Sequence, residues 1–249
     1  MRWGIPLDFF AIHVSPVCLT PSVVFMSKST SAKIIVIDDH PIVSTAVQGI
    51  ALTINGLVFA GSARDCASGR ALVEKTTPEL AITDISLPDG DGIDLIQSIR
   101  TISPKSRILA FSMNKEESLG PRVLKAGAHG YLMKGAAVSQ IQEAIQTVLR
   151  GETYLSSELA RSMAFRSIGR DDQVQDVDTL TNREFQVFRL IGSGKTTREI
   201  SVLLKISIKT VESHRENIKN KVTCDNSNEL AIRARDWVKE YGDENDLRR

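Results

Sequence analysis

The chain has 249 residues, of which 42% are hydrophobic and 24% are charged, and its formal net charge is +1. These values suit two modest globular domains and exclude a strongly basic or acidic chain whose partner could be inferred from net charge alone. The three cysteines are odd in number, widely spaced and without neighbouring histidines, so they predict neither a disulfide framework nor a zinc site. A reducing cytoplasm is the expected compartment.

Residues 1–32 are partly apolar, but Pro6 and Pro21 interrupt them, and no apolar run approaches the roughly 20 residues of a membrane-spanning helix. A secretory signal peptide would need an unbroken apolar core and more positive charge than Arg2 provides. We therefore expect a disordered leader, or an extension upstream of a translation start at Met26, and no membrane partner.

Short β-branched runs alternate with stretches of helical spacing between residues 33 and 152. The expected strands are residues 33–37, 57–60, 80–84, 107–112 and 130–134. The expected helices are residues 41–52, 66–75, 92–102, 116–126 and 138–149. Five strands alternating with five helices predict a doubly wound parallel sheet.

Acidic side chains follow two of these strands directly. Asp38 and Asp39 come after the first strand, and Asp84 ends the third. The carboxyl ends of parallel strands meet at one edge of a sheet, where open α/β sheets bind their ligands. Three carboxylates there would repel one another unless a divalent cation lay between them, and oxygen ligands of this kind suit Mg²⁺ or Mn²⁺.

Two further polar groups end neighbouring strands: Ser112 supplies a hydroxyl and Lys134 an ammonium. A phosphoryl group carried on Asp84 would need a cation, a fixed positive charge and a neutral hydrogen-bond donor on its oxygens. Each polar residue alone is also consistent with capping of its own strand. The full set, in this order and at this spacing, favours a phosphoryl site.

The stretch from about Lys33 to Glu152 resembles a response-regulator receiver domain, and the Asp-Asp-His-Pro run at 38–41 is typical of the NarL/FixJ branch. The resemblance implies an α/β, flavodoxin-like (CheY-like) fold with five parallel strands. It also implies that Asp84 accepts a phosphoryl group from a sensor histidine kinase.

The same resemblance assigns roles to the neighbouring polar residues. The metal ligands are Asp38, Asp39, Asp84 and the backbone carbonyl of Ser86, and the cofactor is Mg²⁺. Besides the phosphoacceptor, the catalytic residues are Lys134 and Ser112, and the switch pair is Ser112 with Tyr131. Gly135 is a departure, since many receivers carry a proline after the lysine, and no cis peptide is therefore expected there.

Residues 153–176 are the expected linker: a helical stretch, 157–165, precedes a polar segment. Which domain that helix packs against is left open by the sequence. Residues 177–243 are expected to form a second, all-α domain. Capping boxes at Thr181 and Thr196 open two helices, and a third runs over 208–222, which predicts a helix-turn-helix.

Helical geometry divides the third helix into two sides. Val211, Ile218 and Val222 share one side and are expected in the core, with His214 as a packed structural residue at its margin. The opposite side could enter the major groove. Residues 181–222 carry nine basic and four acidic residues, a net charge of +5 that indicates a phosphate-backbone partner.

The segment from about Val177 to Tyr241 is similar to the LuxR-type DNA-binding domain of NarL/FixJ regulators. The resemblance rests on Leu-Thr-x-Arg-Glu at 180–184, Glu-Ile-Ser at 199–201 and Lys-Thr-Val-Glu-Ser-His-Arg at 209–215. It implies a dimer formed through residues 227–241. The implied DNA-contacting residues are Lys209, Thr210, Glu212, Ser213, Arg215, Glu216 and Lys219. Some members place a lysine at the Glu216 position.

Together these features predict a two-component response regulator that is not an enzyme. A histidine kinase phosphorylates Asp84, Mg²⁺ assists, and a homodimer binds double-stranded DNA to regulate transcription; RNA polymerase is left open as a further partner. The unphosphorylated receiver is expected to mask or misplace the recognition helix. One alternative is a constitutive DNA-binding regulator whose receiver is only a scaffold. The other is a haloacid-dehalogenase-like, Mg²⁺-dependent phosphatase, which would need an acid at position 86, where this chain has serine.

Overall fold

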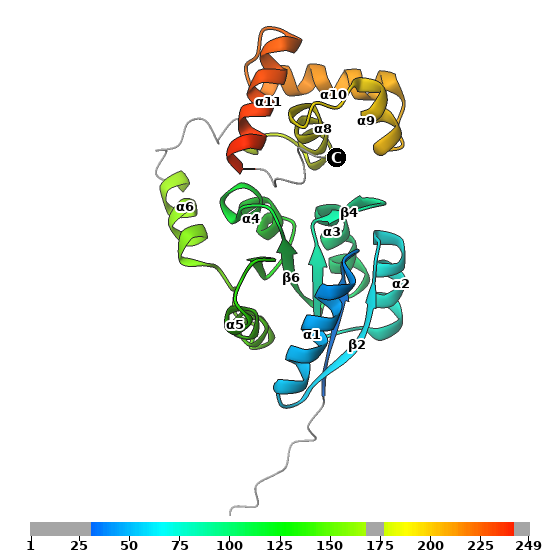
Figure 1. Ribbon diagram of the computed structural model, residues 1–249, viewed down its shortest axis with the longest axis vertical. Coiled ribbons are helices and arrows are strands. Elements are labelled where there is room, and N and C mark those ends of the chain that lie inside the picture. Colours follow the sequence, from blue (N-terminus) through cyan, green and yellow to red (C-terminus); the bar gives the residue numbers. More distant parts are fainter. Residues whose placement is uncertain (1–30, 168–176, 242–249) are drawn as a thin grey trace, which may run out of the picture. The chain divides into compact units, whose positions relative to one another are not determined.

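The computed structural model describes residues 31–167 and 177–241 (Figure 1). The expected leader lies almost entirely outside the described residues, and so does the polar half of the expected linker. Among the described helices, none combines the length and apolarity that a membrane span requires.

Five parallel strands form one sheet in the order β2-β1-β3-β6-β7. This is the doubly wound, flavodoxin-like order, and the expected fold class is confirmed. The strand bounds are β1 Ala32–Ile37, β2 Leu57–Ala63, β3 Leu80–Asp84, β6 Arg107–Ser112 and β7 Gly130–Met133. The order reverses between β1 and β3, so the side chains that follow these two strands open into the crevice where such sheets bind ligands.

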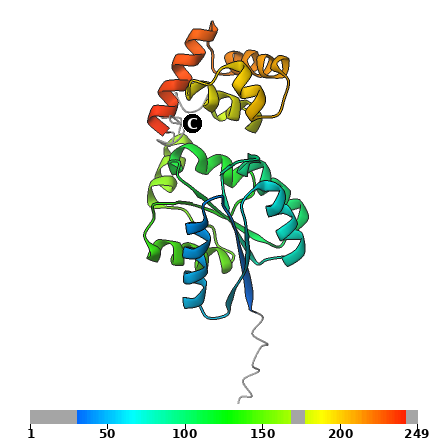
Figure 2. The same cartoon turned by 45° about the vertical axis from the view of Figure 1, so that its right-hand side comes forward.

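Helices cover both faces of this sheet, because alternate residues of each buried strand point to opposite sides. In β1, Ile35 and Ile37 join one apolar cluster with α2 and α3, whereas Ile34 and Val36 join a second with α1 and α5. Figure 2 shows α1, in blue, and α2, in cyan, on opposite sides of the sheet. The helix bounds are α1 Pro41–Thr53, α2 Cys66–Thr76, α3 Gly92–Ile102, α4 Glu116–Lys125 and α5 Val138–Leu149.

The loop after β3 is a small hairpin of β4 (Ser86–Leu87) and β5 (Gly90–Asp91). Its acids cap helices. The Asp91 carboxylate accepts a hydrogen bond from the Ile93 N–H at the start of α3, at 2.7 Å. The Asp89 carboxylate accepts from two backbone N–H groups at the start of α2. The hairpin beside the acidic edge is therefore tied to both neighbouring helices.

The linker helix α6 (Ser157–Ser167) packs on α4, which answers the question that the sequence left open. Leu159 is fully buried against Gly120, where an added Cβ would lie only 2.7 Å from a Leu159 methyl group. Ser156, which caps α6, donates a hydrogen bond to the Glu116 carboxylate at the start of α4. The linker helix thus belongs with the receiver.

The second domain consists of α8 (Asn182–Gly192), α9 (Thr197–Leu203), α10 (Ile208–Lys221) and α11 (Ser227–Tyr241). Both expected capping boxes are present, at the starts of α8 and α9. Aromatic rings hold α8 against α11, since the Trp237 ring meets the Phe185 ring edge-on with centroids 5.2 Å apart. Helices α9 and α10, joined by a tight turn, form the predicted helix-turn-helix.

Candidate functional site

The predicted acids meet at the carboxyl edge of the sheet. One side-chain atom each from Asp38, Asp39, His40 and Asp84 lies within 4.8 Å of the others. The Lys134 ammonium, which follows β7, lies 2.8 Å from Asp84 Oδ2 and 2.7 Å from Asp38 Oδ2. Strand order alone brings these groups together, because each follows a strand that ends at the same edge.

Charge in this acid pocket is unbalanced: three carboxylates face one ammonium. Burial raises the pKa of Asp84, although the Lys134 charge opposes the shift. Burial alone would lower the pKa of Lys134, but the carboxylates of Asp84 and Asp38 outweigh it and the pKa is raised. The pocket therefore favours an added positive charge.

Two carboxylate oxygens in the pocket fit a divalent cation. Asp38 Oδ2 and Asp39 Oδ1 are buried, and each lies beside one nitrogen: the Lys134 ammonium is 2.7 Å from Asp38 Oδ2, and His40 Nδ1 is 2.8 Å from Asp39 Oδ1. Clustered carboxylate oxygens of this kind suit Mg²⁺, which binds proteins through one or two carboxylates and water. The Ser86 N–H donates to Asp84 Oδ1 at 3.1 Å, which sets residue 86 beside Asp84; its carbonyl as a metal ligand stays a prediction.

Two residues of the pocket were missed from the sequence. His40 lies beside the acids, with its Nδ1 2.8 Å from Asp39 Oδ1, and its side chain is half exposed. Gly92 begins α3 directly against Asp84, where a Cβ would lie 2.3 Å from the Asp84 carbonyl oxygen. A glycine at that position lets the helix start in close contact with β3, the strand that ends at Asp84. The sequence signal for this close approach was a glycine at the first position of a helix that otherwise has strong helical spacing of apolar residues.

The predicted switch residues, Ser112 and Tyr131, meet at Asn114, for which the sequence predicted no role. Ser112 is fully buried, and its Oγ accepts hydrogen bonds from the Asn114 backbone N–H at 3.2 Å and from Asn114 Nδ2 at 3.1 Å. The Tyr131 hydroxyl donates to the Asn114 carbonyl at 2.8 Å. Burial also raises the pKa of Tyr131, so the phenol remains protonated and able to donate.

The third helix of the second domain, α10, divides as its spacing predicted. Val211, Ile218 and Val222 are fully buried. The seven predicted DNA-contacting residues are all at least partly accessible: Lys209, Thr210, Glu212, Ser213 and Glu216 are exposed, and Arg215 and Lys219 are intermediate. Their contacts with bases and phosphates stay predictions.

Contacts also join the receiver to the second domain, and all the described residues belong to one compact unit. Arg122 of α4 is nearly buried; its guanidinium donates to the Leu180 carbonyl at 2.8 Å and lies 4.2 Å from the Phe185 ring centroid. The Gln186 amide donates to the Asp91 carboxylate. These contacts use α8 and the turn before it, with the predicted DNA-contacting side of α10 left accessible.

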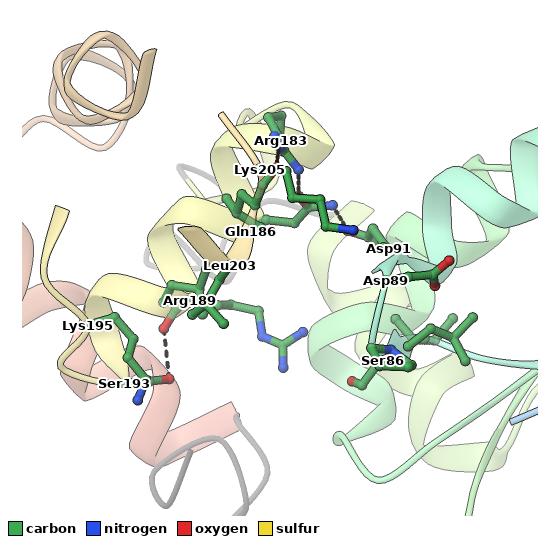
Figure 3. A pocket seen from close by; sticks show the side chains of 16 residues that line it. Ser86, Asp89, Asp91, Arg183, Gln186, Arg189, Ser193, Lys195, Leu203 and Lys205 are labelled. Carbon is green, nitrogen blue, oxygen red and sulfur yellow. Dashed lines mark hydrogen bonds between the residues drawn. The ribbon is translucent and has the colours of Figure 1, made fainter. Parts of the chain in front are cut away.

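A cavity of about 280 Å³ lies beside these contacts. Figure 3 shows it lined by the β4–β5 hairpin and by side chains of the second domain, with the Gln186 side chain directed to Asp91. Burial raises the pKa of Asp91, although the hydrogen bonds from Gln186 and from the Ile93 N–H oppose the shift. The lining of the cavity includes acids of the hairpin, such as Asp91, and basic residues of the second domain, such as Arg189.

Comparison with family models divides the chain in two. Residues 34–146 match the response regulator receiver domain, and residues 178–234 match the bacterial regulatory proteins of the luxR family. The two matches fall on the sheet-containing part and on the helix-turn-helix part.

Full-length relatives share this arrangement. The chain is 32% identical to the oxygen regulatory protein NreC of Staphylococcus aureus over 204 residues, which cover 80% of this chain and 94% of NreC. It is 29% identical to the response regulator GacA of Pseudomonas aeruginosa over 203 residues, which cover 81% of this chain and 94% of GacA. A solved structure of RcsB from Salmonella enterica serovar Typhimurium, bound to promoter rprA with the phosphomimetic BeF₃⁻, matches with a TM-score of 0.63 and 26% identity. That match covers 82% of this chain and 98% of RcsB.

A receiver with its acid pocket, joined to a helix-turn-helix, defines a two-component response regulator whose output is DNA binding. The chain belongs to the NarL/FixJ family of these transcriptional regulators.

Proposed function

We propose that Asp84 is the phosphoacceptor of this regulator and that a sensor histidine kinase is the donor. An Asp84 carboxylate oxygen attacks the phosphorus of the kinase phosphohistidine; the new P–O bond forms as the P–N bond breaks and the imidazole leaves. Support comes from the position of Asp84, which is buried at the end of β3 with its Oδ2 2.8 Å from the Lys134 ammonium. This single contact carries the proposal.

The remaining pocket residues stabilise the transferred group. Asp38, Asp39 and Asp84, with the Ser86 carbonyl, would hold Mg²⁺, which when bound neutralises charge on the phosphoryl oxygens. Lys134 supplies the fixed positive charge, and the Ser112 hydroxyl donates to an oxygen of the acyl phosphate. The buried oxygens of Asp38 and Asp39, which cluster with the Asp84 carboxylate, support this assignment of the metal ligands.

The test is incubation of the intact protein with acetyl phosphate and Mg²⁺, followed by intact-mass spectrometry. We expect one added phosphate on the wild type and none on Asp84→Asn. Omission of Mg²⁺ should abolish the uptake. A wild type that gains no phosphate under these conditions would refute the proposal.

A turnover assay on simple phosphate esters separates this function from a phosphatase. We infer that the chain does not turn over phosphate esters, because position 86 offers a serine hydroxyl where that chemistry needs a general acid. Sustained release of phosphate from a simple ester, lost in Asp84→Asn, would favour the enzyme instead.

We propose that the output is operator binding by a homodimer through the seven accessible residues of α10. Ile232 on α11 is 59% exposed, which supports α11 as the dimer face. In the unphosphorylated protein the receiver misplaces rather than covers the recognition helix, since its hydrogen bonds fall on α8, on the turn before it and on the end of α11, and the predicted DNA-contacting side of α10 is accessible. We place the regulator in the cytoplasm, with RNA polymerase as a further partner.

DNA binding is tested by Lys209→Ala, with Lys75→Ala on α2, an exposed lysine of the receiver, as a control of equal charge. Loss of a phosphate contact should weaken binding across sequences and reduce the slope of log affinity against log salt by about 1. Equal losses in the two variants would contradict the assignment. An operator footprint that is the same for Asp84→Ala and for phosphorylated wild type would support the constitutive alternative.

A further inference from the structure

We propose that Asn114 transmits the state of the Ser112 hydroxyl to the DNA-binding domain through a hydrogen bond to Arg189. The inference rests on the proposed phosphorylation of Asp84 and goes beyond it, because it names the chain's own route from the acid pocket to α8. The Asn114 side chain is 2% exposed, and its Oδ1 accepts from Arg189 Nη2 at 3.3 Å.

Every polar group of Asn114 contacts either the switch pair or the second domain. Its backbone N–H and its Nδ2 both donate to Ser112 Oγ, and its carbonyl accepts from the Tyr131 hydroxyl. Its remaining oxygen faces Arg189 of α8. One buried residue therefore touches both members of the switch pair and a cation of the other domain.

The direction of these bonds follows from the chemistry of the partners. A guanidinium only donates, so the oxygen of the Asn114 amide must face Arg189 and the amide nitrogen must face Ser112. The Ser112 oxygen is consequently the acceptor in this arrangement. In Figure 3 the Arg189 side chain extends from α8 toward the receiver.

A phosphoryl group on Asp84 would disturb this arrangement. When the Ser112 hydroxyl turns toward a phosphoryl oxygen, the Asn114 amide loses the acceptor of its Nδ2, and a buried donor without an acceptor is unfavourable. Asn114 must then change position, and its contact with Arg189 changes with it. Because coupling between sites is reciprocal, the Arg189 contact in turn favours the Ser112 orientation of the unphosphorylated protein.

The experiment measures operator affinity of the full-length protein with and without Mg²⁺ and BeF₃⁻. Arg189→Met retains most of the side-chain stem but removes the donors. We expect the unmodified variant to bind DNA more tightly than wild type, so that the ratio of affinities with and without BeF₃⁻ falls roughly five-fold. The BeF₃⁻ concentration for half-saturation should fall by up to the same factor.

A second variant tests the opposite direction. In Asn114→Asp, one carboxylate oxygen still accepts from Arg189, and the contact becomes an ion pair. The other carboxylate oxygen replaces the amide nitrogen that donated to Ser112, so it can accept a hydrogen bond from the Ser112 hydroxyl. The unphosphorylated arrangement should be strengthened, and the half-saturating BeF₃⁻ concentration should rise roughly five-fold. Opposite shifts of the half-saturating BeF₃⁻ concentration in the two variants cannot arise from a general loss of folding. Thermal melting of each variant is the control for folding.

The matched control is Arg198→Met, which removes an exposed arginine from α9 of the same domain. Its DNA affinity should fall equally with and without BeF₃⁻, leaving the ratio unchanged. If Arg189→Met also leaves the ratio and the half-saturating concentration unchanged, the inference is wrong while the proposed function stands. If the operator affinity of the wild type is the same with and without BeF₃⁻, the proposed function is contradicted instead.

Discussion

The acid pocket and the recognition helix α10 differ in what holds their side chains. In the pocket, Asp84 is 3% exposed, and its position is set by the backbone of a central strand. In α10, the core side is fully buried while the predicted groove side has few fixed contacts. The side chains of the acid pocket are thus placed by rigid strand ends, whereas the predicted DNA contacts depend on accessible side chains that can vary without disturbing the fold.

The largest expected effect comes from removing the one cation that the pocket contains. Lys134→Met leaves the carboxylates of Asp84 and Asp38 buried without their ammonium, and the phosphoryl group loses its fixed positive charge. We expect the rate of phosphate uptake from acetyl phosphate to fall roughly 100-fold or more. Lys75→Met, an exposed lysine on α2, is the control and should react at the wild-type rate. A rate for Lys134→Met within a few-fold of wild type would show that this ammonium does not stabilise the reaction.

A backbone substitution tests how closely the pocket depends on helix placement. Gly92→Ala would put a Cβ against the Asp84 carbonyl, so α3 or β3 must shift, and the free energy of unfolding should fall by about 1–3 kcal/mol. Gly49→Ala on α1 meets no atom within 4 Å and should instead raise it by roughly 0.5–1 kcal/mol. Urea unfolding of the two variants provides the measurement. Similar changes in both would mean that the close approach at Gly92 is relaxed in solution.

Stability of the second domain should depend on pH through Glu184. Burial alone would raise the pKa of this carboxyl, but hydrogen bonds from Lys221 and Thr181 outweigh it, so the pKa lies below its ordinary value. A carboxyl whose pKa is lowered by folding stabilises the folded state at pH values above its ordinary pKa of about 4.3. This contribution is lost as the pH falls through the pKa of the folded state. Glu184→Gln should therefore lower the free energy of unfolding by about 1–2 kcal/mol at neutral pH.

The difference between wild type and Glu184→Gln should shrink as the solution is acidified below the ordinary pKa. Glu240→Gln removes an exposed acid near the end of α11 and should change stability by no more than about 0.5 kcal/mol at any pH. A Glu184→Gln deficit that persists unchanged in acid would show that packing, and not charge, is responsible.

The smallest effect is expected on the groove side of α10. Glu216 lies 2.8 Å from Lys219 and is itself largely exposed. Glu216→Gln removes an acid from the DNA-facing side and releases Lys219 toward phosphates, so nonspecific DNA affinity should rise roughly 3-fold at low salt. The gain should vanish at high salt, as a titration of fluorescent duplex DNA would reveal. A gain that is independent of salt would contradict an electrostatic cause.

Sequence patterns predicted the parts of the molecule whose causes are local. The strand that ends at Asp84 was evident from a short apolar run closed by Pro and Gly, and the capping boxes at Thr181 and Thr196 marked helix starts. The seven-and-four spacing of Val211, Ile218 and Val222 predicted the buried side of α10, which the structure confirms. The expected domain boundaries stay a prediction.

Other features had no local signal. The β4–β5 hairpin was not predicted, because its Gly and Asp residues are ordinary turn residues. The packing of α6 on α4 depends on Leu159 meeting Gly120, two common residues far apart in the chain. Nothing in the sequence near Asn114 indicates that its partner is Arg189, 75 positions away.

By itself, therefore, the sequence determined the alternation of strands and helices, the acids, hydroxyl and lysine at the strand ends, and the two faces of α10. Each of these follows from residue periods of two or 3.6 and from the fact that parallel strands end at one edge. The tertiary structure alone decided that the linker helix α6 packs on α4, that Arg122 of α4 meets α8, and that one asparagine touches both the predicted switch pair and the DNA-binding domain. Such contacts join common residue types across long sequence separations, where only the folded geometry selects one pairing among many.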